Sequence, residues 1–214
     1  MQSNRVLGVL KGQDFPVDQL LAWARSAEIT YAADGAAKAL LDAGLKPIVV
    51  GDMDSLDPST VPPDVRLVKD PDQDTTDCDK LLALASADGI ETLTLIGIEG
   101  DRLDHMMSTL SSLVGRRRRI RLILRRATGF VVPCGESFDL PCPPDTRFSV
   151  IPLTLCWGLN LVNAKWPLHD AELRPGLHVS ISNRSEEGCQ VLLAGGTALV
   201  LIDRLLEEPP HWEE

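Results

Sequence analysis

The sequence has no Cys-x-x-Cys pair and no long apolar run, and we expect no signal peptide. The five cysteines are odd in number and form no Cys-x-x-Cys pair, so a disulfide framework or a zinc site is poorly supported. Free thiols in a reducing cytoplasm are the simpler interpretation. The start, MQSNRVLGVLKG, lacks the apolar region of a signal peptide. No apolar run approaches ~18 residues, so we expect no membrane partner.

Positive charge is also in deficit, with 21 Lys and Arg against 31 Asp and Glu and a formal net charge of -10. Such a surface repels a phosphate backbone, so we expect no nucleic-acid partner. Nine Asp and no Glu lie between Asp52 and Asp79. The opposite bias follows at Arg116–Arg126, where seven of eleven residues are Arg, and we assign no ligand to that run.

The chain has 214 residues, of which 44% are hydrophobic, and this is enough to form a core. Only 4% of the residues are aromatic, so aliphatic side chains must supply most of the packing. In the first half, apolar strands alternate with amphipathic helices. Strands are expected at 6–10, 29–33, 47–50, 93–98 and from 121, and helices at 17–26, 36–43, 76–87 and 104–113. This alternation predicts an α/β domain at 1–140 with a mainly parallel sheet and flanking helices.

The second half has frequent Pro and Gly and no helical periodicity. The stretch CGESFDLPCPPDTRF is the expected boundary. Short strands are expected at 149–153, 159–162, 178–181, 190–194 and 198–202. Short strands separated by turn residues predict a C-terminal antiparallel β-sandwich at 141–214.

Acidic residues follow three of the expected strands: Asp34-Gly35, then Asp52 and Asp54, then Asp101 and Asp104. The carboxyl ends of strands line the ligand crevice in open α/β sheets. Carboxylates gathered there favour Mg²⁺, which prefers oxygen ligands and keeps nucleotide phosphate in its shell. Simpler interpretations stay open: a turn or helix N-cap for the first pair, and a polar loop for the second.

The acidic run DPDQDTTDCDK also has a simpler explanation. It could be a solvated loop, as charge runs often are. It is not a calcium-binding EF-hand loop, because Thr75 stands where Gly is needed and Leu81 where the bidentate Glu belongs. No GxxxxGK[ST] phosphate loop occurs, so another device must hold any ATP.

Three segments in order and spacing carry a family resemblance: ADGAAKALLDAGLKPIVVGDMDSLDP, DPDQDTTDCDK and GIEGDRLDHMMSTL. They resemble three signature segments of the thiamine pyrophosphokinase family. The first resembles its Asp-Gly turn followed by Gly-Asp-x-Asp-Ser, and the second its Asp-Gln-x-x-Thr-Asp-x-x-Lys segment. The third resembles its Gly-Arg-x-Asp-His segment. The later pieces SVIPL, AKWPL and SISN are similar to that family's β-domain. Departures are Ala36 for a frequent second Gly, Asp101 before Arg102 where Gly is common, and Cys78 for an aromatic.

The resemblance implies an enzyme that transfers pyrophosphate from ATP to thiamine, giving thiamine diphosphate and AMP with Mg²⁺. It implies a homodimer, with the nucleotide on the α/β domain, a β-sandwich that helps to hold thiamine, and thiamine where two subunits meet. Asp52, Asp54 and Asp77 are the first metal ligands expected, with Asp34 and Asp104 next.

The remaining roles concern phosphate and thiamine. Arg102 would neutralise phosphate charge with its paired donors, and Lys80 would add a point charge; Asp34 and Gly35 would complete the ATP site. A surface ion pair with Asp77 is the alternative for Lys80. Gln73 could hydrogen-bond thiamine or the nucleotide. His105 stands at a helix start, where a histidine more often has a structural role than the role of a catalytic base.

In the β-domain, Trp166 resembles the aromatic that stacks on thiamine, and a flat face suits a cationic heteroaromatic ligand. Its alternative is a partly buried sandwich Trp. Ser182 and Asn183 resemble a Ser-Asn pair near thiamine, with a strand-end turn as the alternative.

Two other functions compete. The segment IVVGDMDSL resembles an aspartyl-phosphatase box, although that box usually follows the first strand and prefers Thr or Val at Ser55. A non-catalytic thiamine or nucleotide sensor would keep the fold without turnover. The complete set of Asp residues argues against a sensor.

Overall fold

The computed structural model describes residues 5–12, 15–100, 102–114, 119–135, 137–178 and 180–203. Asp101, part of the Arg116–Arg126 run, Val179 within an expected strand and the C-terminal tail lie outside these ranges. The chain folds into two compact units. Of the described residues, those up to 112 and 122–125 form the first unit, and those of 113–121 and 126–203 form the second.

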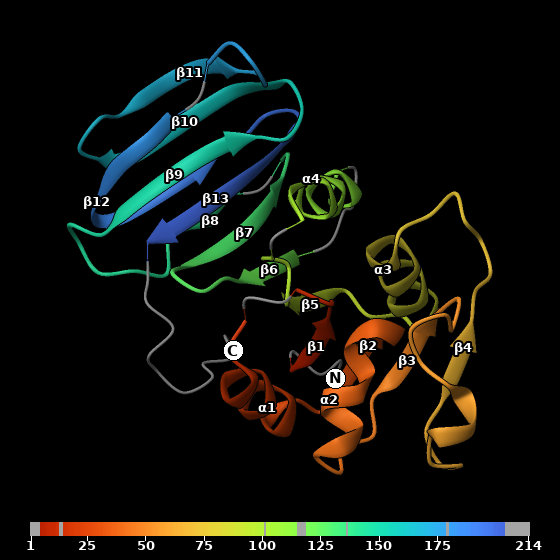
Figure 1. Ribbon diagram of the computed structural model, residues 1–214. Coiled ribbons are helices and arrows are strands. Elements are labelled where there is room, and N and C mark those ends of the chain that lie inside the picture. Colours follow the sequence, from red (N-terminus) through yellow and green to blue (C-terminus); the bar gives the residue numbers. More distant parts are fainter. Residues whose placement is uncertain are drawn as a thin grey trace. The chain divides into compact units, whose positions relative to one another are not determined.

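The first unit is a parallel sheet with helices on both faces (Figure 1). Its strand order is β5-β1-β2-β3-β4, with β6 next to β5. The elements are β1 Val6–Val9, α1 Val17–Ser26, β2 Ile29–Ala33, α2 Asp34–Asp42, β3 Ile48–Gly51, a 3₁₀ turn Pro58–Thr60, β4 Leu67–Lys69, α3 Asp77–Ala87, β5 Thr92–Ile96 and α4 Leu103–Ser112. Strand β6, Arg119–Ile123, has residues in both units.

Alternation along β1 decides which helices cover which face, because successive side chains of a strand point to opposite sides. Leu7 and Val9 pack in one core with residues of α1 and α2, such as Trp23 and Leu40. Gly8 faces the other way, where a Cβ would lie 2.6 Å from Leu95 and 3.0 Å from Leu81 of α3. The missing side chain therefore lets α3 pack closely on the sheet.

The second unit is a β-sandwich. Its strands are β7 Ala127–Pro133, β8 Ser137–Asp139, β9 Arg147–Pro152, β10 Cys156–Ala164, β11 Leu168–Leu173, β12 Ser180–Leu192 and β13 Thr197–Asp203. One sheet has the order β7-β13-β9-β12 and the other β12-β10-β11, with β8 also on β12; all these pairs are antiparallel. Phe148 and Val200 of one sheet share a core with Leu161 and Val191 of the other.

The expected fold class is therefore confirmed, with local differences. α2 begins at Asp34, two residues before its expected start, because the Asp34 carboxylate accepts the Gly35 N–H in the first turn. β4, β7, β8 and β11 were not expected. The strands expected at 178–181 and 190–194 belong largely to one long strand, β12, whose polar middle conceals the pattern. Among the described residues, no helix is long and apolar enough to cross a membrane.

Candidate active site

The ends of β2 and β3 bring three carboxylates together. Asp34 directly follows β2, and Asp52 and Asp54 follow β3, its parallel neighbour. One oxygen from each of these three side chains lies within 4.8 Å of the others. Like charges this close repel one another unless a cation lies between them. The donor set consists of oxygens alone, which fits Mg²⁺ or a similar hard divalent ion.

Asp34 is the buried member of this group, with 2% of its surface exposed. Its two oxygens accept hydrogen bonds from the Gly35 N–H, at 2.5 Å, and from the Met53 N–H, at 2.8 Å. Met53 has a positive φ of 67°, unusual for a residue with a side chain. A Cβ at Gly51 would lie 2.6 Å from the Asp34 Cγ. Asp34 therefore holds the loop that carries Asp52 and Asp54.

Asp52 connects the carboxylate group to the acidic run. Its Oδ2 accepts from the Gln73 side-chain amide at 2.9 Å, and its Oδ1 accepts from the Asp54 N–H at 3.0 Å. These bonds, that from Gln73 foremost, hold the pKa of Asp52 below its usual range. Asp52 therefore stays ionised and able to bind a cation at neutral pH.

The acidic run ends in the capped start of α3. The Thr76 hydroxyl accepts from the Asp79 N–H while Asp79 accepts from Thr76, a capping box. This cap directs Asp77 into the pocket. Burial raises the pKa of Asp77, the charge of Asp34 raises it further, and Lys80 opposes both. Lys80 has 5% of its surface exposed, so the alternative of a surface ion pair is wrong.

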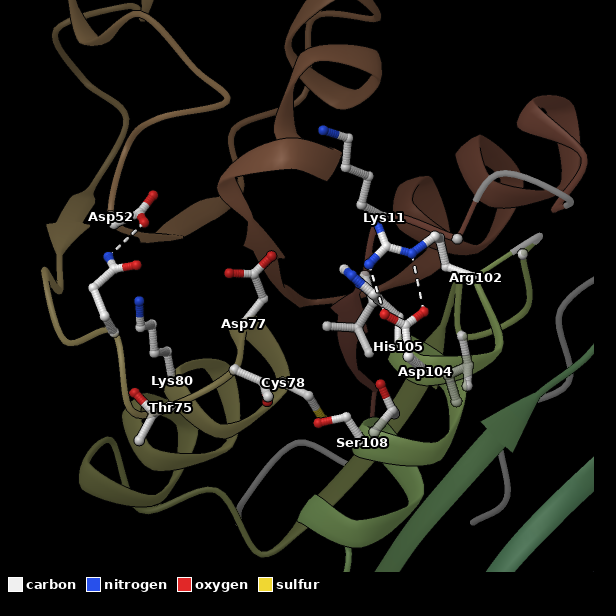
Figure 2. Close-up of a pocket in the computed structure, with 18 residues that line it drawn as sticks. Lys11, Asp52, Thr75, Asp77, Cys78, Lys80, Arg102, Asp104, His105 and Ser108 are labelled. Carbon is white, nitrogen blue, oxygen red and sulfur yellow. Dashed lines mark hydrogen bonds and ion pairs between the residues drawn. The ribbon is translucent and has the colours of Figure 1, made fainter.

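A pocket of about 650 Å³ is lined by Asp52, Asp77 and Lys80 but not by Asp34 or Asp54, and all of its lining belongs to the first unit. Figure 2 shows Asp52, Asp77 and Lys80 around it together with Arg102 and Asp104. Arg102 donates from Nε and Nη2 to the two oxygens of Asp104, at 2.9 and 2.6 Å. This pairing lowers the pKa of Asp104 strongly. Gln73 and His105 also line the pocket.

The expected site residues of the α/β part thus gather in one region. Asp34, Asp52 and Asp54 form the close group, whereas Asp77 and Asp104 line the pocket outside that group. The metal-binding roles of these side chains stay predictions. Sequence reasoning missed Lys11, Thr75 and Ser108, which also line the pocket. A signal existed for Lys11, which stands just beyond an apolar strand, where ligand-binding residues gather.

Of the expected thiamine-binding residues, Gln73 lies in the pocket of the first unit, and the other three lie in the second unit, around the connection from β10 to β11 and in β12. Trp166 is 55% exposed, so part of its ring surface is open to a ligand, and the alternative of a partly buried sandwich Trp stays open. The Lys165 Nζ lies 5.0 Å from the ring centroid of Trp166, which shows that this indole face accepts a cation.

Asn183 is buried and its side chain bonds the backbone around Trp166. Its Oδ1 accepts from the N–H groups of Trp166 and Arg184, at 3.1 and 2.8 Å, and its Nδ2 donates to the Trp166 carbonyl at 2.8 Å. Ser182, with a φ of 57°, lies at a register shift within β12 rather than in a strand-end turn. Asn183 therefore holds the chain that presents Trp166; direct contact of either residue with thiamine stays a prediction.

The fold and the site define a class: an α/β protein with a carboxylate pocket at the carboxyl ends of a parallel sheet, joined to a β-sandwich. The family model "Thiamin pyrophosphokinase, catalytic domain" matches residues 20–124, and "Thiamin pyrophosphokinase, vitamin B1 binding domain" matches residues 140–193. The chain belongs to the thiamin pyrophosphokinase family, and the resemblance of the three acidic segments is confirmed.

Individual relatives agree with this assignment. Thiamin pyrophosphokinase 1 of Caenorhabditis elegans is 29% identical over 166 residues, which cover 72% of this chain and 68% of that protein. The thiamine pyrophosphokinase structure from Bacillus subtilis has a TM-score of 0.75 at 22% identity, covering 93% of this chain and 99% of that one. The Candida albicans enzyme has a TM-score of 0.71 at 18% identity, covering 93% and 88%. At these identities, the structures show the fold alone.

Proposed function

We propose that this protein transfers the pyrophosphoryl group of ATP to the hydroxyl of thiamine, giving thiamine diphosphate and AMP. The observation that carries the proposal is the match of the catalytic-domain model to residues 20–124, which contain most of the carboxylate pocket. In this reaction the thiamine oxygen bonds to the β-phosphorus, the bridge between the α- and β-phosphates breaks towards AMP, and the hydroxyl proton is lost.

Mg²⁺ is the cofactor that we propose for the carboxylate group. Asp34, Asp52 and Asp54 would hold it, and Asp77 would contribute directly or through water. When bound, the ion supplies charge neutralisation for the phosphate oxygens. Asp104 is a weaker ligand in this arrangement, because both of its oxygens are engaged by Arg102.

Phosphoryl-type transfer depends on positioning and charge neutralisation more than on covalent help from the protein. Lys80, buried in the pocket wall, and Arg102, at its rim, would bind phosphate oxygens. Gly35, in the first turn of α2 next to Asp34, would also contribute to the ATP site. Gln73, whose amide donates to Asp52, would contact the nucleotide or thiamine.

Residues 141–214 would hold thiamine, and residues 1–140 the nucleotide and metal. The vitamin B1 binding model, which matches residues 140–193, supports this division. Trp166 would stack on thiamine, with Ser182 and Asn183 nearby. We further propose a homodimer in which a neighbouring chain completes the thiamine site. The five free cysteines suit a cytoplasmic enzyme.

One assay tests the proposal: purified protein with ATP, thiamine and Mg²⁺, followed by chromatographic measurement of AMP and thiamine diphosphate. We expect the two products in equal amounts and neither without a divalent cation. Release of inorganic phosphate without thiamine diphosphate would indicate a phosphatase. Binding of thiamine or ATP without any product would indicate a sensor, and either result contradicts the proposal.

A further inference from the structure

Lys11 lies outside the three acidic segments, directly beyond β1, yet it lines the carboxylate pocket. We propose that Lys11 binds the polyphosphate of the nucleotide, as a third cation beside Lys80 and Arg102. This inference rests on the proposed function of the pocket as an ATP site. Figure 2 shows the three side chains reaching the pocket from different parts of the chain: the end of β1, α3 and the segment before α4.

The ammonium group of Lys11 lies at the edge of the carboxylate group. Its Nζ donates to the Ser55 Oγ at 3.3 Å, and Ser55 directly follows Asp54. Within the described part of the chain, no carboxylate forms an ion pair with Lys11. A neutral hydroxyl is a weak partner for an ammonium compared with a phosphate oxygen. The Lys11 charge is therefore available where metal-bound phosphates would lie.

Gly35 provides the space that Lys11 occupies. A Cβ at Gly35 would lie 2.5 Å from the Lys11 Cδ and 3.2 Å from its Nζ. The aliphatic stem of Lys11 thus lies against the first turn of α2, next to Asp34. A side chain at position 35 would push the stem away, since the far part of a lysine moves more easily than a helix. The two residues of the Asp-Gly pair therefore have different roles. Asp34 belongs to the carboxylate group, and Gly35 leaves room for the side chain of Lys11.

The three cations of the pocket differ in how firmly carboxylates and burial hold them. Arg102 is held by Asp104, and Lys80 is buried within the Coulomb field of Asp77. Lys11 is exposed, and its long stem can follow phosphate oxygens as a mobile point charge. ATP carries several negative charges along its polyphosphate. The metal, Lys80 and Arg102 would not contact all of these charges. A third cation, Lys11, would complete the neutralisation.

Binding without turnover tests the proposal most directly. The α,β-methylene analogue of ATP, which cannot be cleaved at the reacting bridge, is titrated with Mg²⁺ into wild-type protein and Lys11→Ala. We expect ~10-fold weaker binding in Lys11→Ala, because a charge-assisted phosphate contact is lost. Lys11→Arg should retain most of the affinity. Gly35→Ala should weaken binding without changing any charge. In steady-state assays, Lys11→Ala should raise KM for ATP and leave KM for thiamine unchanged.

Lys38→Ala is the matched control, since Lys38 is an exposed lysine that pairs with Asp42 on α2. Wild-type affinity in Lys11→Ala, or equal weakening in Lys38→Ala, would overturn the role of Lys11. Wild-type protein that binds the analogue but forms no thiamine diphosphate contradicts the proposed function instead. The titration of Lys11→Ala then still decides whether Lys11 binds polyphosphate.

Discussion

Asp52 is the residue at which metal binding can be tested with least disturbance to the fold, because its side chain is partly exposed and bonded to Gln73. Asp52→Asn and Asp54→Asn remove charge from the proposed Mg²⁺ site while keeping the side-chain shape. A bound metal supplies several kcal/mol of transition-state stabilisation, so we expect activity to fall by ~100-fold or more. Mn²⁺ affinity, measured by paramagnetic resonance, should fall in parallel.

Asp42→Asn is the control for this pair, since Asp42 is exposed on α2 and outside the pocket. Melting temperatures measured without metal should be close to wild type in all three variants. Near-normal activity of either pocket variant in the presence of EDTA would show that the metal assignment is wrong.

Trp166 and Asn183 are the two residues at which the proposed thiamine binding can be tested. Trp166→Ala should raise KM for thiamine by ~5- to 30-fold, because a stacking loss of ~1–2 kcal/mol is expected, and leave KM for ATP nearly unchanged. Trp166→Phe should recover part of the loss. If Asn183 acts by holding the backbone of Trp166, Asn183→Ala should raise the same constant, and the double variant should be less than additive.

Trp157→Ala serves as the control for Trp166, because Trp157 is a second exposed tryptophan in the same unit. It should leave both Michaelis constants unchanged. A folded Trp166→Ala protein with normal KM for thiamine would exclude the stacking role. A lowered melting temperature with unchanged constants would instead indicate a packing role.

At the scale of elements, a polar contact joins β2, the segment before β4 and the end of α3. The buried Tyr31 hydroxyl donates to Asp88 at 2.8 Å, and Arg66 donates to the same carboxylate at 2.9 Å. Tyr31→Phe should lower the free energy of unfolding by ~1 kcal/mol, the usual net value of one hydrogen bond. Urea unfolding at pH 7 measures this difference.

The same contact predicts a pH dependence. The hydrogen bond from Arg66, followed by that from Tyr31, lowers the pKa of Asp88 in the folded state. The unfolded chain therefore binds a proton at a higher pH than the folded protein does, with an ordinary pKa of ~3.9. The stabilising contribution is complete above that value and is lost as the pH falls through the lower folded pKa. Asp88→Asn should remove this part of the acid sensitivity; an unchanged dependence of unfolding between pH 5 and pH 3 contradicts the assignment.

At the scale of the whole molecule, we predict a homodimer. Trp166, Leu177 and Ile181 of the second unit are each more than half exposed in the single chain, and exposed apolar side chains of this size favour a partner surface. Light scattering should give twice the mass of the chain at assay concentration. Ile181→Lys should shift the equilibrium towards monomer and lower activity, whereas Val17→Lys, at an exposed apolar residue of the first unit, should do neither. A fully active wild-type monomer would refute this prediction.

The sequence by itself determined the fold class and the family. Strand and helix periods of the first half are local properties, and α1 and β2 have their expected bounds. The acidic residues at strand ends could be placed at one edge of the sheet, because parallel strands bring their carboxyl ends together. Those signals depend on neighbouring residues along the chain, so they can be read without knowing the tertiary structure.

Only the tertiary structure decided which side chains meet. Asp34, Asp52 and Asp54 form the close group while Asp104 is taken by Arg102, a choice made by loop geometry rather than by spacing. Lys11 reaches the pocket because Gly35, distant in sequence, leaves it room. The long β12 stayed hidden because its buried polar residues, Asn183 and Ser185, are satisfied by hydrogen bonds to segments far along the chain. These hydrogen-bond partners come together only when the chain folds, so the local sequence pattern cannot predict them.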